Sequence, residues 1–324
     1  MIDRRLLLGG VAAAGLSAWG PARAQPRGQP ARIAYISERG GPNEFEQAFL
    51  RGLRERGLVD GTQVVVDFRW AGFDAQRLKA LATEALAAAP ALVVIPDGAS
   101  MRMVRSLDSS MAIVVPTMGD AIANGLSSSL ARPDRNITGV SVLATELGPK
   151  RVELMKEAVP GLRRLGVLVN LVRRPQFGAE TRAAAEALGL VVVEMRLPLP
   201  DGIEAGFAAA VRQGAQAVVV VSDTSTITYR AALGEAALKH RLPTIFANRT
   251  YLRGGGLMSY GPDLEAAFHR AAYYVDRLLK GARPADLPIE QPTTIQLVLN
   301  QRTAKAIGFK FPQALLVRAD EVIE

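Results

Sequence analysis

The sequence contains no cysteine among its 324 residues. Disulfide bonds, thiolate metal sites, cysteine nucleophiles and lipid-modified cysteines are therefore excluded. Histidine is almost as scarce: His240 and His269 fall in or at the end of expected helices, and we interpret both as surface side chains rather than catalytic bases. Aromatic residues make up 6% of the chain, which disfavours a large cage of stacked rings.

Motifs of common enzymes are also missing. The chain has no G-x-S-x-G elbow, no G-x-x-x-x-G-K-[ST] loop and no G-x-G-x-x-G fingerprint. Its carboxylates lack the clustered spacing of a metal site, so we expect no metal and no cofactor. The basic residues are dispersed and no aromatic residues interleave them, which argues against nucleic-acid binding. An exported α/β enzyme stays as the less favoured alternative.

The N-terminus has the pattern of an export signal. An arginine pair precedes the uncharged run Leu6–Trp19, whose 14 residues fall short of the roughly 20 that a membrane-spanning helix needs. Ala22 and Ala24 then supply small residues at the −3 and −1 positions of a cleavage site. We predict a signal peptide over residues 1–24, cleaved near Ala24, and a mature protein in the periplasm. The arginine pair suits a twin-arginine signal, but the general secretory route and a buried N-terminal helix stay open.

Short β-branched runs alternate with Ala- and Leu-rich helical stretches from Arg32 onward, the pattern of a parallel sheet with helices on both faces. About 300 mature residues exceed what one hydrophobic core usually serves. We therefore predict an α/β fold of two doubly wound parallel-sheet lobes. Strands are expected at 32–36, 64–69, 91–95 and 112–115 in a first series, and at 164–169, 191–196, 216–221 and 243–246 in a second.

The two series look like one unit used twice. The stretch 91–97 resembles 217–223 at an offset of 126 residues, and both stretches end in aspartate. The dipeptide Gly57-Leu58 before one strand likewise matches Gly189-Leu190 before another. Two such lobes would direct the carboxyl ends of their strands at a shared cleft, where open α/β sheets bind ligands.

Three connections between the lobes are expected to form a hinge about which they rotate while few dihedral angles change. We place the crossings at Asn136–Ser141, at the Gly-rich stretch 253–260 and near Gly281–Pro288. The resulting division assigns residues 31–138 and 254–282 to lobe 1, and residues 139–253 and 283–324 to lobe 2.

Acidic side chains follow several expected strands at the cleft end. Asp97, Asp120 and Asp223 could pair with a ligand ammonium group through short, directional hydrogen bonds. The alternative is that each only caps the helix that follows, a common role of aspartate at a helix start. For Asp97 the two interpretations stand equal, whereas for Asp223 we favour ligand contact.

Hydroxyl, amide and guanidinium groups are the candidates for a ligand carboxylate. Ser100 and the pair Ser225-Thr226 would add hydroxyls to the backbone N–H groups of the helices they open, although such residues are by default helix caps. Arg249 could clamp a carboxylate bidentately or be an exposed loop charge. The other polar positions at expected cleft ends are Ser37, Thr117, Thr224 and Asn248.

Phe177 and Tyr260 are the aromatic candidates for a pocket wall. Phe45 ranks below them because it could equally face the core, and Trp70 is expected to pack at the lobe surface. An amino acid or other small carboxylate fits this set of side chains best.

Three stretches carry a family resemblance that extends over the mature chain. They are Asn136-Ile137-Thr138-Gly139-Val140-Ser141, Leu154-Met155-Lys156-Glu157-Ala158-Val159-Pro160 and Gly255-Gly256-Leu257-Met258-Ser259-Tyr260-Gly261-Pro262. The sequence resembles the ABC-transporter substrate-binding proteins with a type I periplasmic-binding fold, in the subgroup whose characterised relatives bind aromatic amino acids.

By position, this resemblance implies ligand contacts for Asp120, for Asp223 with Thr224, and for the loop after Asn170. Ala121 stands where the family often has proline, and residues 171–177 lack the glycine, asparagine and serine of the family's loop. The identity of the ligand therefore stays open.

We predict a monomeric periplasmic solute-binding protein that captures an amino acid or related carboxylate by hinge closure and hands it to an ABC permease in the inner membrane. A ligand sensor for a membrane receptor kinase is the alternative, because the same fold would serve both tasks.

Overall fold

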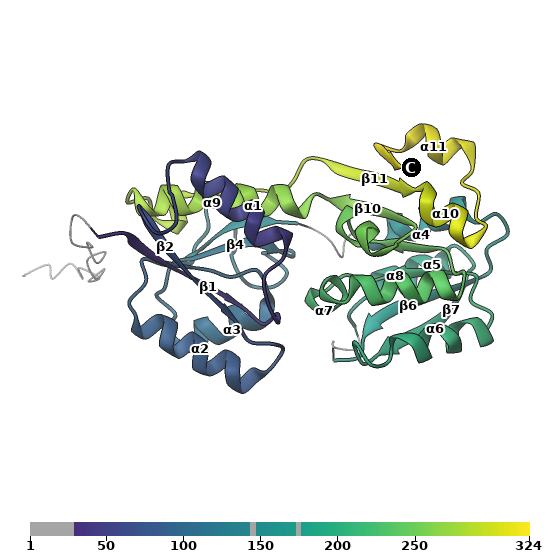
Figure 1. Ribbon diagram of the computed structural model, residues 1–324, viewed down its shortest axis with the longest axis horizontal. Coiled ribbons are helices and arrows are strands. Elements are labelled where there is room, and N and C mark those ends of the chain that lie inside the picture. Colours follow the sequence, from purple (N-terminus) through teal and green to yellow (C-terminus); the bar gives the residue numbers. More distant parts are fainter. Residues whose placement is uncertain (1–28, 143–146, 173–175) are drawn as a thin grey trace, which may run out of the picture.

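The computed structural model of the chain describes residues 29–142, 147–172 and 176–324, which form two lobes side by side (Figure 1). The predicted signal peptide lies outside the described residues. Within these ranges, none of the helices is both long enough and apolar enough to span a bilayer.

Lobe 1 is built on a five-stranded parallel sheet in the order β2-β1-β3-β4-β5. Helices cover both of its faces, so successive strand residues point alternately into two separate cores. The strands are β1 (Ala31–Ser37), β2 (Val64–Trp70), β3 (Leu92–Val94), β4 (Ile113–Met118) and β5 (Ile137–Ser141). One face carries α1 (Glu44–Glu55) and α9 (Leu264–Leu279), and the other carries α2 (Ala75–Ala87) and α3 (Gly98–Leu107).

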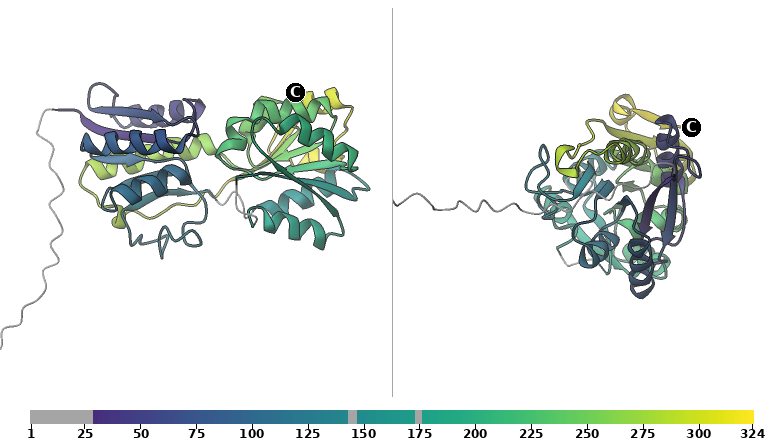
Figure 2. Two further views of the ribbon diagram at one scale, coloured as in Figure 1. Left: turned by 90° about the horizontal axis from the view of Figure 1, so that it is seen from below. Right: turned by 90° about the vertical axis from the view of Figure 1, so that its left-hand side faces the viewer.

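Lobe 2 contains a seven-stranded sheet in the order β12-β11-β10-β9-β8-β6-β7, parallel throughout except where β10 meets β11. Figure 2 shows helical layers on both sides of this sheet as well. The strands are β6 (Arg164–Asn170), β7 (Val191–Leu197), β8 (Ala217–Val220), β9 (Thr244–Phe246), β10 (Met258–Pro262), β11 (Ile295–Asn300) and β12 (Glu321–Ile323).

The helices of lobe 2 divide between the two faces of its sheet as in lobe 1. One face packs against α4 (Gly148–Ala158), α5 (Ala179–Ala187), α10 (Gln301–Ile307) and α11 (Gln313–Arg318). The other packs against α6 (Ile203–Arg212), α8 (Arg230–Lys239) and the 3₁₀ helix η1 (Arg249–Gly254). The short helix α7 (Thr224–Thr228) follows β8, and η2 (Pro284–Asp286) follows α9.

The predicted internal repeat is confirmed by the strand order. The order β7-β6-β8-β9-β10 in lobe 2 repeats β2-β1-β3-β4-β5 in lobe 1, with β8 in the place of β3. Gly57 and Gly189, which end the equivalent helices α1 and α5, adopt left-handed φ angles of 74° and 73°. Glycine is favoured at such helix ends because it has no Cβ to clash in that conformation.

The lobe boundaries differ from the sequence prediction at all three crossings. The strand β5 pairs with β4, so lobe 1 runs on past residue 138. The strand β10 pairs with β9 and β11, so residues 258–262 belong to lobe 2. Glu290 bridges to Val140, and its N–H donates to the Gly139 carbonyl over 3.0 Å, so residues 283–290 stay with lobe 1. Local patterns located these strands, but hydrogen bonds to distant strands decide the sheet to which each belongs.

Candidate functional site

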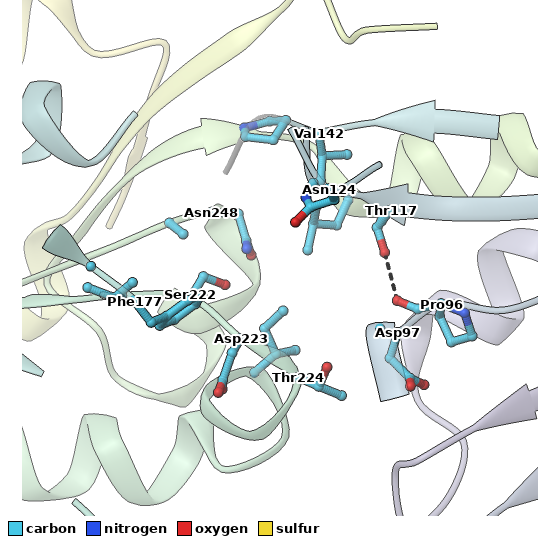
Figure 3. Close-up of a pocket in the computed structure, with 18 of the residues that line it drawn as sticks. Pro96, Asp97, Thr117, Asn124, Val142, Phe177, Ser222, Asp223, Thr224 and Asn248 are labelled. Carbon is cyan, nitrogen blue, oxygen red and sulfur yellow. Dashed lines mark hydrogen bonds between the residues drawn. The ribbon is translucent and has the colours of Figure 1, made fainter. Parts of the chain in front are cut away.

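A cleft of about 610 Å³ lies between the lobes, at the carboxyl ends of strands from both sheets. Figure 3 shows that its polar side chains come from both sides, with Asp97 and Thr117 from lobe 1 opposite Asp223 and Thr224 from lobe 2. Six of the twelve predicted site residues line it: Asp97, Thr117, Phe177, Asp223, Thr224 and Asn248.

Asp97 caps α3, and its carboxylate accepts three hydrogen bonds within lobe 1. Its Oδ1 accepts from the Ser100 N–H over 2.8 Å, and its Oδ2 accepts from the Ser37 hydroxyl and the Glu38 N–H, each over 3.0 Å. Only 6% of the residue is exposed. The capping interpretation therefore describes Asp97, while Ser37 and Ser100 are buried behind the cleft wall.

Asp223 holds the equivalent position in lobe 2, at the start of α7. Its Oδ1 accepts from the Thr226 N–H over 2.7 Å, and the Thr226 hydroxyl in turn accepts from the Asp223 N–H over 2.8 Å, which completes a capping box. The Oδ2 atom accepts from the Asn170 side-chain amide over 3.2 Å. Asp223 is more exposed to solvent than Asp97, and it lines the cleft. Asn170 is buried behind Asp223 and orients its carboxylate.

The wall beneath Asp223 is held by a buried tyrosine. The Tyr251 hydroxyl lies 2.8 Å from the Thr226 hydroxyl and 3.1 Å from that of Ser222, and its ring stacks on Phe246 with centroids 4.8 Å apart. Burial raises the pKa of Tyr251, so its hydroxyl stays protonated. Ser225 and Thr226 are themselves buried. Neither hydroxyl reaches the cleft, although both were expected from the sequence to contact the ligand.

Asp120 does not line the cleft, but the turn that it caps does. Its Oδ1 accepts from the N–H groups of Ile122 and Ala123 over 2.8 and 2.9 Å. Its backbone carbonyl accepts from the Asn124 side chain over 2.7 Å, and Asn124 enters the cleft. Sequence reasoning missed Asn124, although its position four residues after a strand-end aspartate was a usable signal.

Two predicted residues point away from the cleft. Arg249 forms an ion pair with Glu321 of β12 over 2.9 Å. Tyr260 packs against the hydrophobic cluster on the α4 face of lobe 2, and its carbonyl accepts from Nε of the buried Arg151 over 2.8 Å. Neither side chain lines the cleft as predicted, because Tyr260 belongs to β10 within the seven-stranded sheet and Arg249, at the start of η1, pairs with Glu321.

An aromatic wall covers the lobe 1 side of the cleft. Phe45 of α1 and Phe268 of α9 stack with centroids 4.7 Å apart and planes 9° apart. Leu264, one helical turn before Phe268, and Val142 extend this wall, and Phe177 faces the cleft from lobe 2. Phe45 was ranked too low, and Phe268 was missed although its i, i+4 spacing from Leu264 was visible in the sequence.

A buried cation adjoins the aromatic wall. Arg39, 5% exposed, forms an ion pair with Glu46, and its guanidinium lies 5.9 Å from the Phe45 ring centroid. The Tyr35 hydroxyl donates to Glu46 over 2.5 Å, and burial, reinforced by Glu46, raises the tyrosine's pKa. Arg39 lines the cleft, so a positive charge balanced by Glu46 is part of its surface.

The described residues contain no group of three or more histidines, aspartates and glutamates placed to hold a metal ion. The cleft combines the carboxylates of Asp223 and Glu180 on lobe 2, an aromatic wall on lobe 1, and hydroxyl and amide groups between them. Such a surface suits a small molecule with a positive group and an apolar part.

Comparison with known proteins shows the family of the chain. The family described as ABC transporter substrate binding protein matches residues 32–323. A tyrosine-binding protein of Clostridioides difficile (strain R20291) is 21% identical over 281 residues, which cover 86% of this chain and 80% of the relative.

Solved structures share the fold over 91% of this chain. An ABC domain in complex with L-Trp from Streptococcus pneumonia has a TM-score of 0.80 at 23% identity, with all of that chain covered. A conserved domain protein from Vibrio cholerae O1 biovar El Tor has a TM-score of 0.81 at 22% identity, also with full coverage. A ligand-free, open substrate-binding protein with adhesive properties from Clostridium difficile has a TM-score of 0.62 at 20% identity, with 99% of that chain covered.

Proposed function

Because the chain belongs to the family of ABC transporter substrate-binding proteins, we propose that its cleft captures an amino acid with an aromatic or other large apolar side chain. The observation that carries this proposal is the placement of the partly exposed Asp223 carboxylate opposite the Phe45–Phe268 wall across the same cleft. An amino acid presents an ammonium group and a side chain on one carbon, so it can meet both at once.

Each part of the ligand has a candidate partner. The ammonium group would pair with Asp223, whose orientation is set by Thr226 and Asn170. The side chain would lie on the Phe45–Phe268 stack, where burial of one aromatic ring provides a large apolar contact. The carboxylate would accept hydrogen bonds from Asn124 and from the Thr224 hydroxyl, which lie on opposite lobes.

Two relatives support an aromatic side chain over other amino acids. One carries the name of a tyrosine-binding protein, and one solved structure contains L-Trp. The cleft volume of about 610 Å³ lies within the range of roughly 300 to 1,000 Å³ that is usual for small-molecule sites. The aromatic wall of this chain supports the same class independently of those names.

Capture would proceed by rotation of the lobes about their three connections. The ligand's partners come from both lobes, so the complete set of contacts exists only when the lobes are together. A ligand shifts such an equilibrium only through its greater affinity for the closed state. We propose that the closed form delivers the ligand to the permease of an ABC transporter in the inner membrane, and that residues 1–24 export the chain to the periplasm.

The test is a thermal-shift and calorimetry screen of residues 25–324 against the twenty amino acids, small sugars, purines and aromatic carboxylates. Ligand at 100 times its dissociation constant should stabilise the fold by about 2.7 kcal/mol. We expect tryptophan, tyrosine or phenylalanine to give the largest shift and to be recovered chemically unchanged. A shift with sugars but no amino acid, or turnover of the bound compound, would refute the proposed ligand class.

Export is tested separately. Expression of the full chain in a Gram-negative host, osmotic shock and N-terminal sequencing should yield a periplasmic protein that starts near Gln25. An intact N-terminus in the cytoplasmic fraction would contradict the signal peptide without bearing on the ligand.

A further inference from the structure

Apart from the cleft, the two lobes meet through charged side chains beside it. Arg230, at the start of α8 in lobe 2, places NH2 3.0 and 3.1 Å from the two carboxylate oxygens of Glu44, at the start of α1 in lobe 1. Both side chains are largely buried, with 20% of Arg230 and 16% of Glu44 exposed. The NH1 atom of Arg230 also donates to the Ile227 carbonyl over 3.0 Å, which directs the guanidinium toward lobe 1.

An aromatic contact joins the lobes at the neighbouring residue. The ring of Tyr229 lies 5.9 Å from the ring of Phe73, which follows β2 in lobe 1. Phe73 has a φ of 62°, a left-handed conformation that is unfavourable for a residue with a bulky side chain. Backbone hydrogen bonds to the loop after β1 hold Phe73 in that conformation, including one from the Phe73 N–H to the Glu38 carbonyl over 2.6 Å. Backbone strain of this kind persists where the surrounding structure supports it.

A second ion pair lies at the hinge itself. Arg253 of η1 places NH2 2.6 Å from Oε1 of Glu265, which comes two residues after the helix cap Asp263 and so directly follows the second crossing. Residues that flank a crossing change their separation little when the lobes rotate. Arg253 also places NH1 3.7 Å from Glu44, so Glu44 has two arginine partners on lobe 2. Glu44 and Arg230 lie farther along the sequence from the crossings than Arg253 and Glu265, so we expect Glu44 and Arg230 to separate on opening.

We infer that Glu44, Phe73, Tyr229 and Arg230 form an interlobe bridge that sets the ligand affinity without touching the ligand. None of these four side chains lines the cleft. Each contact they make across the lobes is formed only in the closed state and so stabilises that state selectively. A ligand that needs the closed state binds more tightly as that state becomes more populated. The inference rests on the proposed function, because it concerns the closure that captures the ligand.

The bridge makes closure sensitive to ionic strength. Screening shortens the reach of charge interactions from roughly 10 Å at 0.1 M salt to roughly 3 Å at 1 M. Partly buried pairs are screened less than exposed ones, and ion pairs that keep some exposure change an equilibrium by up to about fivefold. We therefore expect affinity and closure to weaken modestly together as salt is raised, and Arg230→Gln to reduce that dependence.

Lobe separation can be measured without a known ligand, because the chain has no cysteine. The exposed positions Arg77 in α2 and Ala205 in α6, one on each lobe (Figure 1), are replaced by cysteine and spin-labelled. Distance distributions are recorded for this double-labelled chain and for its Arg230→Gln and Glu44→Gln versions, at 0.1 and 1 M NaCl, with and without L-tryptophan. The control is Arg318→Gln, which removes an ion pair inside lobe 2 in which NH1 of Arg318 contacts both carboxylate oxygens of Glu157.

Without ligand, we expect Arg230→Gln and Glu44→Gln to shift the distribution toward longer distances at low salt. Glu44→Gln also loses the contact with Arg253, so it should shift at least as far as Arg230→Gln, and the double variant should shift no further than Glu44→Gln. L-tryptophan affinity should fall about two- to fivefold in each, and not in Arg318→Gln. Phe73→Gly should lower affinity while leaving the unfolding midpoint unchanged or raised, because glycine accepts the left-handed backbone.

Distances and affinities that Arg230→Gln leaves unchanged at both salt concentrations would overturn the bridge. If L-tryptophan and other amino acids fail to bind any version while the ligand-free distances still depend on Arg230, the bridge stands and the proposed ligand class fails.

Discussion

The side-chain amide of Asn170 donates a hydrogen bond to the carboxylate of Asp223 over 3.2 Å, joining the ends of the neighbouring strands β6 and β8. With the Thr226 N–H on its other oxygen, Asp223 is held at the cleft wall before any ligand arrives. An orientation fixed in advance lowers the entropy cost of binding. Asp223 therefore caps the start of α7 and, as we propose, also binds the ammonium group of the ligand.

These two roles of Asp223 can be separated by substitution. Asparagine is also a good helix cap, so Asp223→Asn should keep α7 intact while it removes the negative charge. We expect the affinity for L-tryptophan to fall at least tenfold, about 1.4 kcal/mol, with an unfolding midpoint close to that of the wild type. Calorimetry and thermal unfolding measure the two quantities. Asp74→Asn, which keeps the cap of α2 outside the cleft, is the matched control; equal affinities in all three proteins would remove Asp223 from the site.

The aromatic wall should discriminate among side chains. Phe268→Leu keeps an apolar surface but loses the ring that stacks on Phe45. Aromatic pairs add about 0.5 to 1.5 kcal/mol beyond simple burial. The affinity for tryptophan should therefore fall about three- to tenfold relative to that for leucine, measured by competition. Phe309→Leu, which disturbs the ring pair Phe309–Phe311 in lobe 2, should leave that ratio unchanged.

The buried ion pair between Arg39 and Glu46 beside the cleft should contribute strongly to the free energy of unfolding. Glu46→Gln leaves Arg39 charged and buried, and it weakens the bonds from Tyr35 and from the Asn43 N–H. Breaking a buried pair by neutralising one member costs about 3 to 5 kcal/mol. Urea unfolding should show a loss of that size. Glu153→Gln, which removes the exposed pair with Lys150, should cost under about 1 kcal/mol. Equal losses in the two variants would show that the buried pair stabilises the fold no more than the exposed pair does.

Acid should weaken the ion pair between Arg270 and Glu290 near the hinge. Arg270 holds Glu290 through two hydrogen bonds of 2.6 and 2.8 Å, which lower the pKa of Glu290 below its ordinary value of 4.5. Because the folded-state pKa is depressed, the stability from this pair is fully present above about pH 4.5 and is lost as the pH falls through the lowered pKa.

We therefore expect Glu290→Gln to melt at a lower temperature than the wild type at pH 7, and the two melting temperatures to converge as the pH falls below that range. Scanning calorimetry from pH 3 to pH 7 measures the convergence. A difference that stays constant down to pH 3 would show that Glu290 acts through packing rather than through charge.

Local sequence patterns located eight of the ten strands in the two copies of the repeated unit, because apolar runs and glycine-ended helices reflect short-range forces. The offset of 126 residues between Asp97 and Asp223 placed the two aspartates after equivalent strands, β3 and β8. Because ligands bind at the carboxyl ends of such strands, this pairing predicted the position of the cleft. Arg39 and Asn124 were missed, since each reaches the cleft through a loop whose path depends on residues far away in the sequence.

Sequence by itself thus determined the alternation of strands and helices, the duplication of the unit and the identity of the helix caps, since all of these rest on neighbouring residues. Tertiary structure alone decided that β10 joins lobe 2, that Tyr260 and Arg249 turn away from the cleft, and that Glu44 meets Arg230 across 186 positions of sequence. The reason is physical: backbone pairing between strands and side-chain contacts between lobes join residues that lie far apart in the sequence, so no local pattern reveals them.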